Sequence, residues 1–312
     1  MRVLLTCPPM LRSFHHVAHH FEAAGVECVR PDVTQILQES ELMSLVPEFD
    51  GWIIGDDPAT RAVFQAGKNG KLRAAVKWGV GVDNVDLAAA RELGLPITNT
   101  PGMFGTEVAD VAIGYVIALA RHTFAIDRGV RAGEWPKPVG TSLAGKTVAL
   151  VGFGDIGRNT ARRLLVCGMN VLVYDPFYKA VEGIAPVTPE QWPNRVNEAD
   201  FIVLTCALTR ENRHLLNNAS LDLCKNGVRI VSVSRGPLID ETALVTALQS
   251  GRVAGAALEV AETEPLPEAS PLREFPQCIF GSHNASNTLE AVIRTSERAI
   301  SELFSFLGLR SP

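Results

Sequence analysis

The feature that most constrains the fold of this chain is a glycine-rich turn between an apolar run and a helix-like segment. Residues 147–151 form the apolar run, Gly152-Phe153-Gly154-Asp155-Ile156-Gly157 forms the turn, and residues 158–167 have a helical pattern. Glycines at this spacing permit a tight turn, the approach of backbone amides to a pyrophosphate, and close packing of helix on strand. The pattern predicts a βαβ unit that binds a dinucleotide through Gly152, Gly154, Asp155, Ile156 and Gly157. An ordinary strand-to-helix connection is the alternative.

A second apolar run, residues 171–174, ends at Asp175. In dinucleotide-binding units, an acidic residue roughly 20 positions beyond the glycines accepts hydrogen bonds from the ribose hydroxyls of NAD and repels the 2′-phosphate of NADP. We therefore expect NAD as the cofactor. For Asp175 taken alone, the alternative is a solvated carboxylate that starts the turn at Pro176.

Composition limits the class of protein. The 312 residues are 46% hydrophobic and 20% charged, which fits a globular chain of two domains at about 100–200 residues each. A net charge of -5 argues against nucleic-acid binding, and we recognise neither a membrane span nor a signal peptide. The six cysteines show no CxxC spacing, which favours buried, reduced thiols. These observations predict a cytoplasmic enzyme that binds neither nucleic acid nor membrane.

Short apolar runs alternate with helix-like segments along the chain, as is typical of parallel sheets covered by helices on both faces. The runs are residues 2–5, 51–54, 74–78, 147–151, 171–174, 201–205, 229–233, 253–258 and 278–280. Because the glycine turn lies mid-chain, we expect two Rossmann-like or flavodoxin-like α/β domains with the active site in the cleft between them. Residues 1–100 plus 284–312 would form the substrate-binding domain, and residues 101–283 the NAD-binding domain. A helical pattern at 289–307 predicts a closing helix that returns to the first domain.

Arg235, Glu264 and His283 each follow shortly after an apolar run. A guanidinium that binds anions, a carboxylate and an imidazole are the groups needed to move a proton and a hydride at a 2-hydroxy or 2-keto acid. Singly, each residue has an ordinary explanation, as a turn residue, a loop residue before proline, or a helix-start residue. Beside an NAD-type turn, the three together predict a catalytic set.

Several further stretches form a specific combination, although each one alone could arise by chance. They are residues 79–86 (GVGVDNVD), 99–102 (NTPG), the glycine turn with Asp175-Pro176, 233–237 (VSRGP), Glu259-Val260 through Glu264-Pro265-Leu266, and Ser282-His283. With these motifs, nearly the whole chain resembles the D-2-hydroxyacid dehydrogenases, particularly the short phosphoglycerate-dehydrogenase-like members. The resemblance implies hydride transfer between nicotinamide C4 and substrate C2, and a homodimer that pairs through its nucleotide domains.

The resemblance also implies roles for individual residues. Arg235 would bind the substrate carboxylate, which a bidentate guanidinium suits better than lysine does. Glu264 would hold a ring nitrogen of His283, which would give a proton to the keto oxygen in reduction and take it back in oxidation. A histidine titrates near neutral pH, and a carboxylate partner favours its charged form. The other implied residues are Trp78, Gly79, Val80 and Gly81 at the substrate, and Ala207, Thr209, Val233, Ser234 and Glu259 at the cofactor.

The chain departs from the family's usual pattern around His283. Ser282 and Asn284 flank this histidine, where the family usually has a proline before it and an aliphatic residue after it. Glu259, implied to lie near the nicotinamide carboxamide, stands where most members carry aspartate. Because of Ser282 and Asn284, the cleft near His283 is expected to be more polar. Carboxylates in the turn 55–58 would also repel a doubly anionic substrate unless a base compensates, so the identity of the acid stays open.

Four of the seven histidines lie in the run His15-His16-Val17-Ala18-His19-His20. On one helix the i, i+4 pairs would share a face, a spacing that can bind a divalent metal. No acidic or cysteine ligand in the segment completes such a site, so we expect a solvent-facing helix and no metal. A contact between Arg12 and a second anionic group of the substrate is a further hypothesis.

The sequence thus predicts an NAD-dependent D-2-hydroxyacid dehydrogenase or 2-keto-acid reductase that acts on a small 2-hydroxy or 2-keto acid. One alternative is an NAD(H)-sensing corepressor or scaffold on the same fold, which would have no need to keep the three catalytic groups together. Another is oxidation of a different small anion such as formate, for which glutamine is expected in place of Glu264. The alanine-rich segment 106–121 predicts a well-buried helix at a domain or subunit interface.

Overall fold

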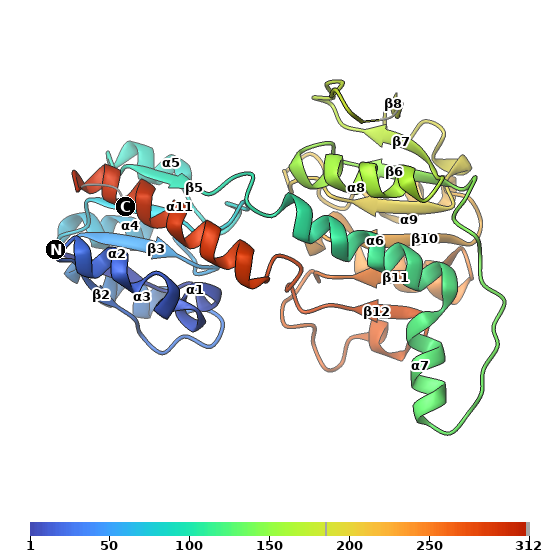
Figure 1. Ribbon diagram of the computed structural model, residues 1–312, viewed down its shortest axis with the longest axis horizontal. Helices are drawn as coiled ribbons and strands as arrows, with labels where there is room; N and C mark the ends of the chain where they lie inside the picture. The colour runs from blue at the N-terminus through green and yellow to red at the C-terminus, as the bar shows by residue number, and fades with distance from the viewer. Residues whose placement is uncertain (185, 310–312) are drawn as a thin grey trace. The chain divides into compact units, whose positions relative to one another are not determined.

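The computed structural model describes residues 1–184 and 186–309, and the chain divides into two compact units (Figure 1). The first unit consists of residues 1–103 with the described part of 287–312, and the second of the described residues in 104–286. Each unit is built on one parallel sheet. The prediction of two parallel-sheet α/β domains is therefore confirmed.

The first unit has a five-stranded parallel sheet in the order β2-β1-β3-β4-β5. Its strands are β1 (Arg2–Leu5), β2 (Glu27–Val29), β3 (Gly51–Ile54), β4 (Ala74–Lys77) and β5 (Ile97–Asn99). Its helices are α1 (Pro8–Arg12), α2 (Ala18–Ala23), α3 (Glu39–Leu45), α4 (Arg61–Asn69), α5 (Leu87–Glu92) and α11 (Leu289–Leu307). The strands β3 and β4 are buried throughout, because helices on both faces of a parallel sheet exclude water.

Helix α11 is the predicted closing helix, and it packs on β3 and β4 of the first unit. Thr288 caps its N-terminus by accepting a hydrogen bond from the amide of Ala291, and Gly308 ends it with a left-handed backbone, φ 72°. Its apolar face is buried. At Gly51 an added Cβ would lie 3.1 Å from the side chain of Leu303, so a glycine there lets the helix lie close to the sheet.

The second unit has a seven-stranded parallel sheet in the order β12-β11-β10-β9-β6-β7-β8. Its strands are β6 (Thr147–Val151), β7 (Asn170–Tyr174), β8 (Thr188–Glu190), β9 (Phe201–Leu204), β10 (Val228–Ser232), β11 (Val253–Leu258) and β12 (Cys278–Phe280). Strand order reverses at β6, which pairs with β7 on one side and β9 on the other. In open α/β sheets, ligands bind outside the carboxyl ends of the strands at such a switch point.

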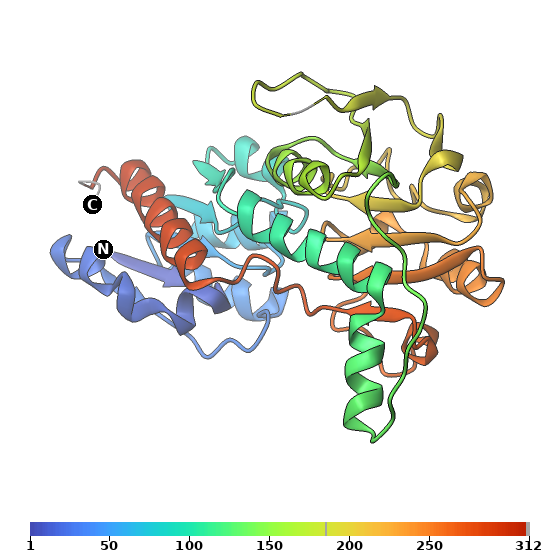
Figure 2. The same ribbon diagram turned by 45° about the vertical axis from the view of Figure 1, so that its right-hand side comes forward.

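The helices of the second unit are α6 (Gly105–Arg121), α7 (Thr123–Arg131), α8 (Asp155–Val166), α9 (Asn218–Leu223) and α10 (Glu241–Gln249). Helix α6 is the predicted buried helix, and it packs on α8, β10 and β11. It stops at His122, whose left-handed φ of 57° turns the chain into α7. Figures 1 and 2 show α7 extending away from the sheet before the chain returns to β6. Among the described helices, none alone is long and apolar enough to cross a membrane, whereas α6 and α7, bent by 67°, meet that test only as a pair.

Candidate active site

The glycine turn joins β6 to α8, and its first and third glycines have no room for a side chain. Gly152 has φ 96°, and an added Cβ would lie 2.6 Å from the backbone of Cys206. At Gly157 an added Cβ would lie 2.1 Å from the carbonyl oxygen of Gly152. Gly154 stands immediately before α8, with Asp155 and Ile156 in the first helical turn. The turn therefore fits a pyrophosphate at the N-terminus of α8, where backbone amides and the helix dipole favour an anion.

Asp175 follows β7 and holds the neighbouring glycine turn. Its Oδ2 accepts a hydrogen bond from the amide of Phe153 at 2.6 Å, and its Oδ1 accepts one from the amide of Phe177 at 2.8 Å. The ring of Phe153 packs on Tyr178 with centroids 5.2 Å apart. The carboxylate thus lies beside the turn, which is the position that a ligand of the adenosine ribose occupies in this type of unit.

The loops after β9 and β10 adjoin the same turn. The hydroxyl of Thr205 donates to the carbonyls of Val151 and Gly152 at 3.1 and 2.9 Å, and the hydroxyl of Ser234 donates to the carbonyl of Cys206. Burial raises the pKa of the Cys206 thiol to about 11, so this sulfur stays protonated at neutral pH. The loops after β6, β9 and β10 therefore form one connected rim.

Asn212 shapes the loop that carries two predicted cofactor residues. Its Oδ1 accepts from the amide of Thr209, and its Nδ2 donates to the carbonyl of Ala207, each at 2.7 Å. Val233, at the end of β10, is tied to β9 by its amide, which donates to the carbonyl of Leu204 at 3.2 Å. The sequence reasoning missed Asn212, because an asparagine in a polar loop carries no distinguishing pattern.

Two of the three predicted catalytic residues meet directly. His283 Nδ1 lies 2.8 Å from Glu264 Oε2, and their side chains are 33% and 32% exposed. The other oxygen of Glu264 accepts from the amide of Ala261 at 3.1 Å, which fixes the carboxylate. Because an ionised carboxylate only accepts hydrogen bonds, this contact puts a proton on Nδ1.

Arg235 lies on the loop after β10, and this loop packs against the loop that carries Glu264. Its Nη1 donates to the carbonyl of Ser234 at 2.9 Å. At Gly236 an added Cβ would lie 1.9 Å from backbone atoms of Ala261. The two loops therefore touch backbone to backbone.

Glu259 directly follows β11 and is buried, with 4% of its surface exposed. Its Oε2 accepts from the hydroxyl of Tyr115 at 2.5 Å, and its Oε1 accepts from the amide of Asn284. Burial and this hydrogen bond raise the pKa of Tyr115 above its usual range. Tyr115 was not predicted; the only signal was a phenol in a helix that has no other aromatic residue.

The predicted substrate residues Trp78, Gly79, Val80 and Gly81 follow β4 in the first unit. The indole of Trp78 donates to Ser296 Oγ at 3.1 Å. The amide of Gly79 donates to Thr100 Oγ1 at 2.8 Å, so this amide already has a partner within the protein. The carbonyl of Val80 accepts from Asn99 Nδ2 at 2.7 Å. These bonds hold the peptide planes of the loop in place.

Lys77, the last residue of β4, is a buried cation that the sequence reasoning missed. Its ammonium pairs with Asp56 Oδ1 and donates to the carbonyl of Trp78, both at 3.0 Å. A lysine in a buried apolar run is the signal that could have revealed it, because such a charge is stable only when paired. Lys77 is a base beside one of the two carboxylates that were expected to repel a doubly anionic substrate.

The four-histidine segment does not form the single helix that its spacing suggested. A 3-10 turn (Phe14–His16) is separated by Val17 from α2, so the rings pair as neighbours: His15 with His16 at 4.0 Å and His19 with His20 at 3.9 Å. The prediction that the i, i+4 histidine pairs share one helix face is therefore wrong. Within residues 1–184 and 186–309, no group of three or more histidine, cysteine or acidic residues is arranged to hold a metal ion.

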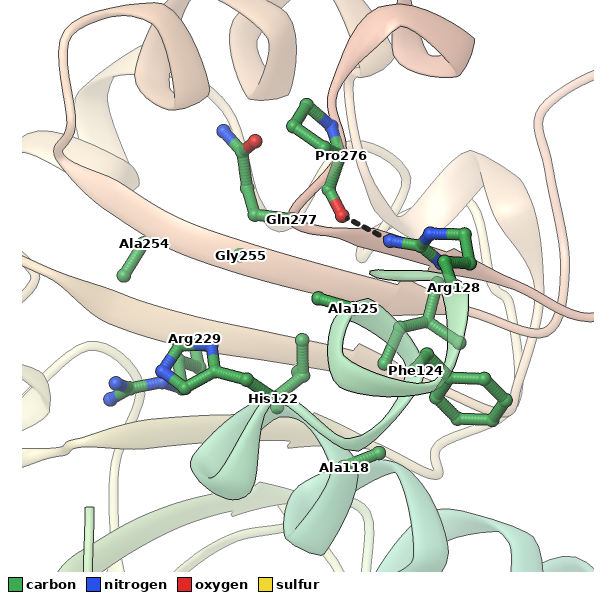
Figure 3. Close-up of a pocket in the computed structure, with 12 residues that line it drawn as sticks. Ala118, His122, Phe124, Ala125, Arg128, Arg229, Ala254, Gly255, Pro276 and Gln277 are labelled. Atoms are coloured by element: carbon green, nitrogen blue, oxygen red, sulfur yellow. Dashed lines mark hydrogen bonds between the residues drawn. The ribbon is translucent and has the colours of Figure 1, made fainter. Parts of the chain in front are cut away.

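A pocket lies at the bend between α6 and α7 (Figure 3). Its lining includes Ala118, His122, Phe124, Arg128 and Arg229. Arg128 closes one side by donating to the carbonyl of Pro276 at 2.8 Å. The pocket is lined by none of the predicted catalytic or cofactor residues.

Comparison with known proteins agrees with this geometry. The model of the D-isomer specific 2-hydroxyacid dehydrogenase, NAD binding domain, matches residues 113–285. The chain belongs to this family. It is an NAD-dependent oxidoreductase that acts on CH–OH donors.

Two reductases and one solved structure are similar to this chain over most of their length. The chain is 36% identical over 278 residues to hydroxypyruvate reductase from Thermotoga maritima, covering 88% of this chain and 90% of that one. It is 35% identical to glyoxylate reductase from Thermofilum pendens, covering 82% of this chain and 77% of that one. The crystal structure of TT0316 protein from Thermus thermophilus is similar with a TM-score of 0.88 and 32% identity, covering 100% and 99% of the two chains.

Proposed function

We propose that this enzyme interconverts a small 2-keto acid and its D-2-hydroxy acid, with His283 as the general acid and base. The observation that carries the proposal is the contact of His283 Nδ1 with Glu264, at 2.8 Å. The carboxylate fixes the tautomer and the orientation of the ring, so that Nε2, at the tip of the side chain, is the atom that exchanges the proton with the substrate oxygen.

Arg235 is proposed to bind the substrate carboxylate with its guanidinium, and the backbone around Val80 and Gly81 to assist it. A guanidinium offers two parallel donors to a carboxylate. Fixing the carboxylate orients the neighbouring keto group, which lowers the entropy cost of reaching the transition state.

The cofactor residues are proposed to be Gly152, Gly154, Asp155, Ile156 and Gly157 at the pyrophosphate and Asp175 at the ribose. Ala207, Thr209, Val233 and Ser234 would form the rim towards the nicotinamide. Bound NADH supplies the hydride for the keto carbon. Two observations support this arrangement. Gly152 and Gly157 have no room for a side chain, and the Asp175 carboxylate lies beside the turn as a hydrogen-bond acceptor.

For the substrate we propose a short acid such as glyoxylate or hydroxypyruvate, on which the two reductases described above act by name. In the turn after β3, Asp56 stays exposed while its partner Lys77 is buried, so the pair offers little net positive charge to a second anionic group.

A spectrophotometric screen tests this proposal. Loss of NADH absorbance is measured with glyoxylate, hydroxypyruvate, phosphonopyruvate and 3-phosphohydroxypyruvate. We expect turnover with the two short acids and much weaker turnover with the phosphorylated and phosphonate acids. NADH binding without turnover on any acid would instead favour the sensor alternative.

We also propose that two copies pair through α6, α7 and the segment that follows. Phe124, Val130, Trp135 and Val139 are exposed large apolar side chains in this region, and pairing of two copies here would remove them from water. Light scattering should give twice the chain mass for the wild type and a lower mass for Phe124→Asp. A monomeric wild type at working concentration would contradict the dimer.

A further inference from the structure

Glu259 is a buried carboxylate for which two neutral groups act as donors. Tyr115 OH donates to one oxygen at 2.5 Å, and the backbone amide of Asn284 donates to the other. Burying an ionised carboxylate is costly unless its oxygens are hydrogen-bonded. Each of these contacts is thus needed for the carboxylate to lie where it does.

The structure makes space for this carboxylate at Gly281. An added Cβ at that position would lie 1.9 Å from Glu259 Oε2 and 2.7 Å from Tyr115 OH. The absence of a side chain at 281 is therefore what allows the phenol and the carboxylate to meet. Gly281 itself is tied to β11, because its amide donates to the carbonyl of Leu258 at 2.8 Å.

The same few residues hold the backbone of His283. The amide of His283 donates to the carbonyl of Glu259 at 2.8 Å, and the next amide, that of Asn284, donates to the carboxylate of Glu259. His283 has φ 55°, a left-handed conformation that is uncommon for a residue with a side chain and persists only when its surroundings enforce it. Glu259 supplies two of the contacts that enforce it.

We propose that Glu259 and Tyr115 form a positioning pair that holds the left-handed backbone of His283 and so aims its imidazole at the substrate. The inference rests on the proposed role of His283 as the proton donor. It differs from the role that family resemblance gives to an acidic residue at 259, a contact with the nicotinamide carboxamide. Glu259 acts through the 281–284 loop, and Tyr115 acts through Glu259.

Tyr115→Phe tests the pair, because it removes one hydroxyl and keeps the ring in α6. We expect kcat to fall about 10-fold, within the ~10²-fold that a small displacement of a reacting group can cost. The Michaelis constant for the keto acid and the dissociation constant of NADH should stay within about twofold, since neither ligand contacts the phenol under this proposal. In the apoenzyme, the histidine NMR signal that disappears in His283→Gln should shift in Tyr115→Phe.

Tyr174→Phe is the matched control. Its hydroxyl also donates a single hydrogen bond, to the carbonyl of Asn194 at 2.6 Å, in the same unit. It should lower stability by a similar amount and leave kcat and the His283 signal unchanged. Gly281→Ala is a second probe: its Cβ would displace the carboxylate or the phenol, and kcat should fall at least as far as in Tyr115→Phe.

A double substitution separates this inference from the proposed function. If Tyr115 acts only through His283, adding Tyr115→Phe to His283→Gln should cause no further loss of kcat. Wild-type kcat in Tyr115→Phe, or a weaker affinity for NADH with kcat unchanged, would overturn the positioning role and leave the role of His283 intact. Wild-type turnover in His283→Gln would instead overturn the proposed function.

Discussion

Two histidine–glutamate pairs in the second unit resemble each other closely, although only one matches the catalytic motifs. His283 lies 2.8 Å from Glu264, and His214 lies 2.6 Å from Glu262. Both histidines have a left-handed backbone, with φ 55° and 52°, and their side chains are 33% and 35% exposed. Distance, backbone and exposure therefore do not tell a catalytic pair from a structural one.

The pairs differ in the ring nitrogen that the carboxylate contacts. Glu264 contacts Nδ1, the nitrogen next to the backbone, whereas Glu262 contacts Nε2, the nitrogen at the tip. A histidine that exchanges a proton with a substrate does so most readily from the tip, while the other nitrogen is held by an orienting group. His214 has its tip turned to Glu262 and is not arranged for that task.

The two carboxylates also differ in what else they hold. Glu262 and Glu241 bond reciprocally: Glu262 Oε2 accepts from the amide of Glu241 at 3.3 Å, and Glu241 Oε1 accepts from the amide of Glu262 at 2.8 Å. Burial, with the nearby charge of Glu262, raises the pKa of Glu241. Glu262 thus ties the start of α10 to the loop before Glu264. Glu264 also holds a backbone amide, that of Ala261, so the direction of the ring is the feature that separates chemistry from structure in this comparison.

The largest expected effect on kcat comes from replacing the imidazole of His283. His283→Gln should lower kcat by about 10²–10⁴-fold, the usual contribution of general acid–base catalysis. His214→Gln, the matched control, should change kcat by no more than about threefold and lower the free energy of unfolding by about 1–2 kcal/mol. Steady-state kinetics and denaturant unfolding measure both. Equal losses of kcat in the two variants would remove the distinction between the pairs.

A smaller effect is expected from the carboxylates. Glu264→Gln should lower kcat on the order of 10²-fold, because the orienting acceptor of a catalytic imidazole is lost. Glu262→Gln should instead act on stability, by about 1–2 kcal/mol, because its side chain links the imidazole of His214 to the amide of Glu241 at the start of α10. For each variant, kcat is measured by steady-state kinetics and stability by the midpoint of denaturation. A Glu262 variant that is normally stable but loses activity would reverse the assignment.

The smallest effect is expected from Arg213, whose guanidinium lies 3.6 Å from Glu262 and is 56% exposed. Exposed ion pairs contribute little to stability. Arg213→Ala should therefore change the free energy of unfolding by no more than about 0.5 kcal/mol, as measured in urea, with kcat unchanged. A loss comparable to that of His214→Gln would show that Arg213, rather than the imidazole, neutralises Glu262.

The sequence predicted those features whose cause is local. The glycine turn could be interpreted because each glycine has its own steric reason, and the strands could be located because buried parallel strands are continuous apolar runs. Arg235, Glu264 and His283 were named from motifs. The family resemblance also implied that Glu264 holds a ring nitrogen of His283, and the structure shows that this nitrogen is Nδ1.

Features set by contacts between distant segments were not predictable in the same way. The pair of His214 with Glu262 joins residues 48 positions apart, and Tyr115 reaches Glu259 across 144 positions. The helix expected at 106–121 was correct, but nothing in the pattern indicated that His122 would turn the chain into α7. The prediction for the histidine run was wrong for a related reason. The i, i+4 spacing assumes one continuous helix, and the helical structure is interrupted at Val17.

Single-turnover kinetics test most directly the claim that the imidazole of His283 gives its proton to the keto oxygen. Enzyme saturated with NADH is mixed with excess keto acid, and the loss of NADH absorbance is followed for the wild type, His283→Gln and His214→Gln. We predict unchanged NADH affinity in all three, a wild-type rate for His214→Gln, and a rate lower by about 10²–10⁴-fold for His283→Gln. Hydride transfer at the wild-type rate in His283→Gln would contradict the claim.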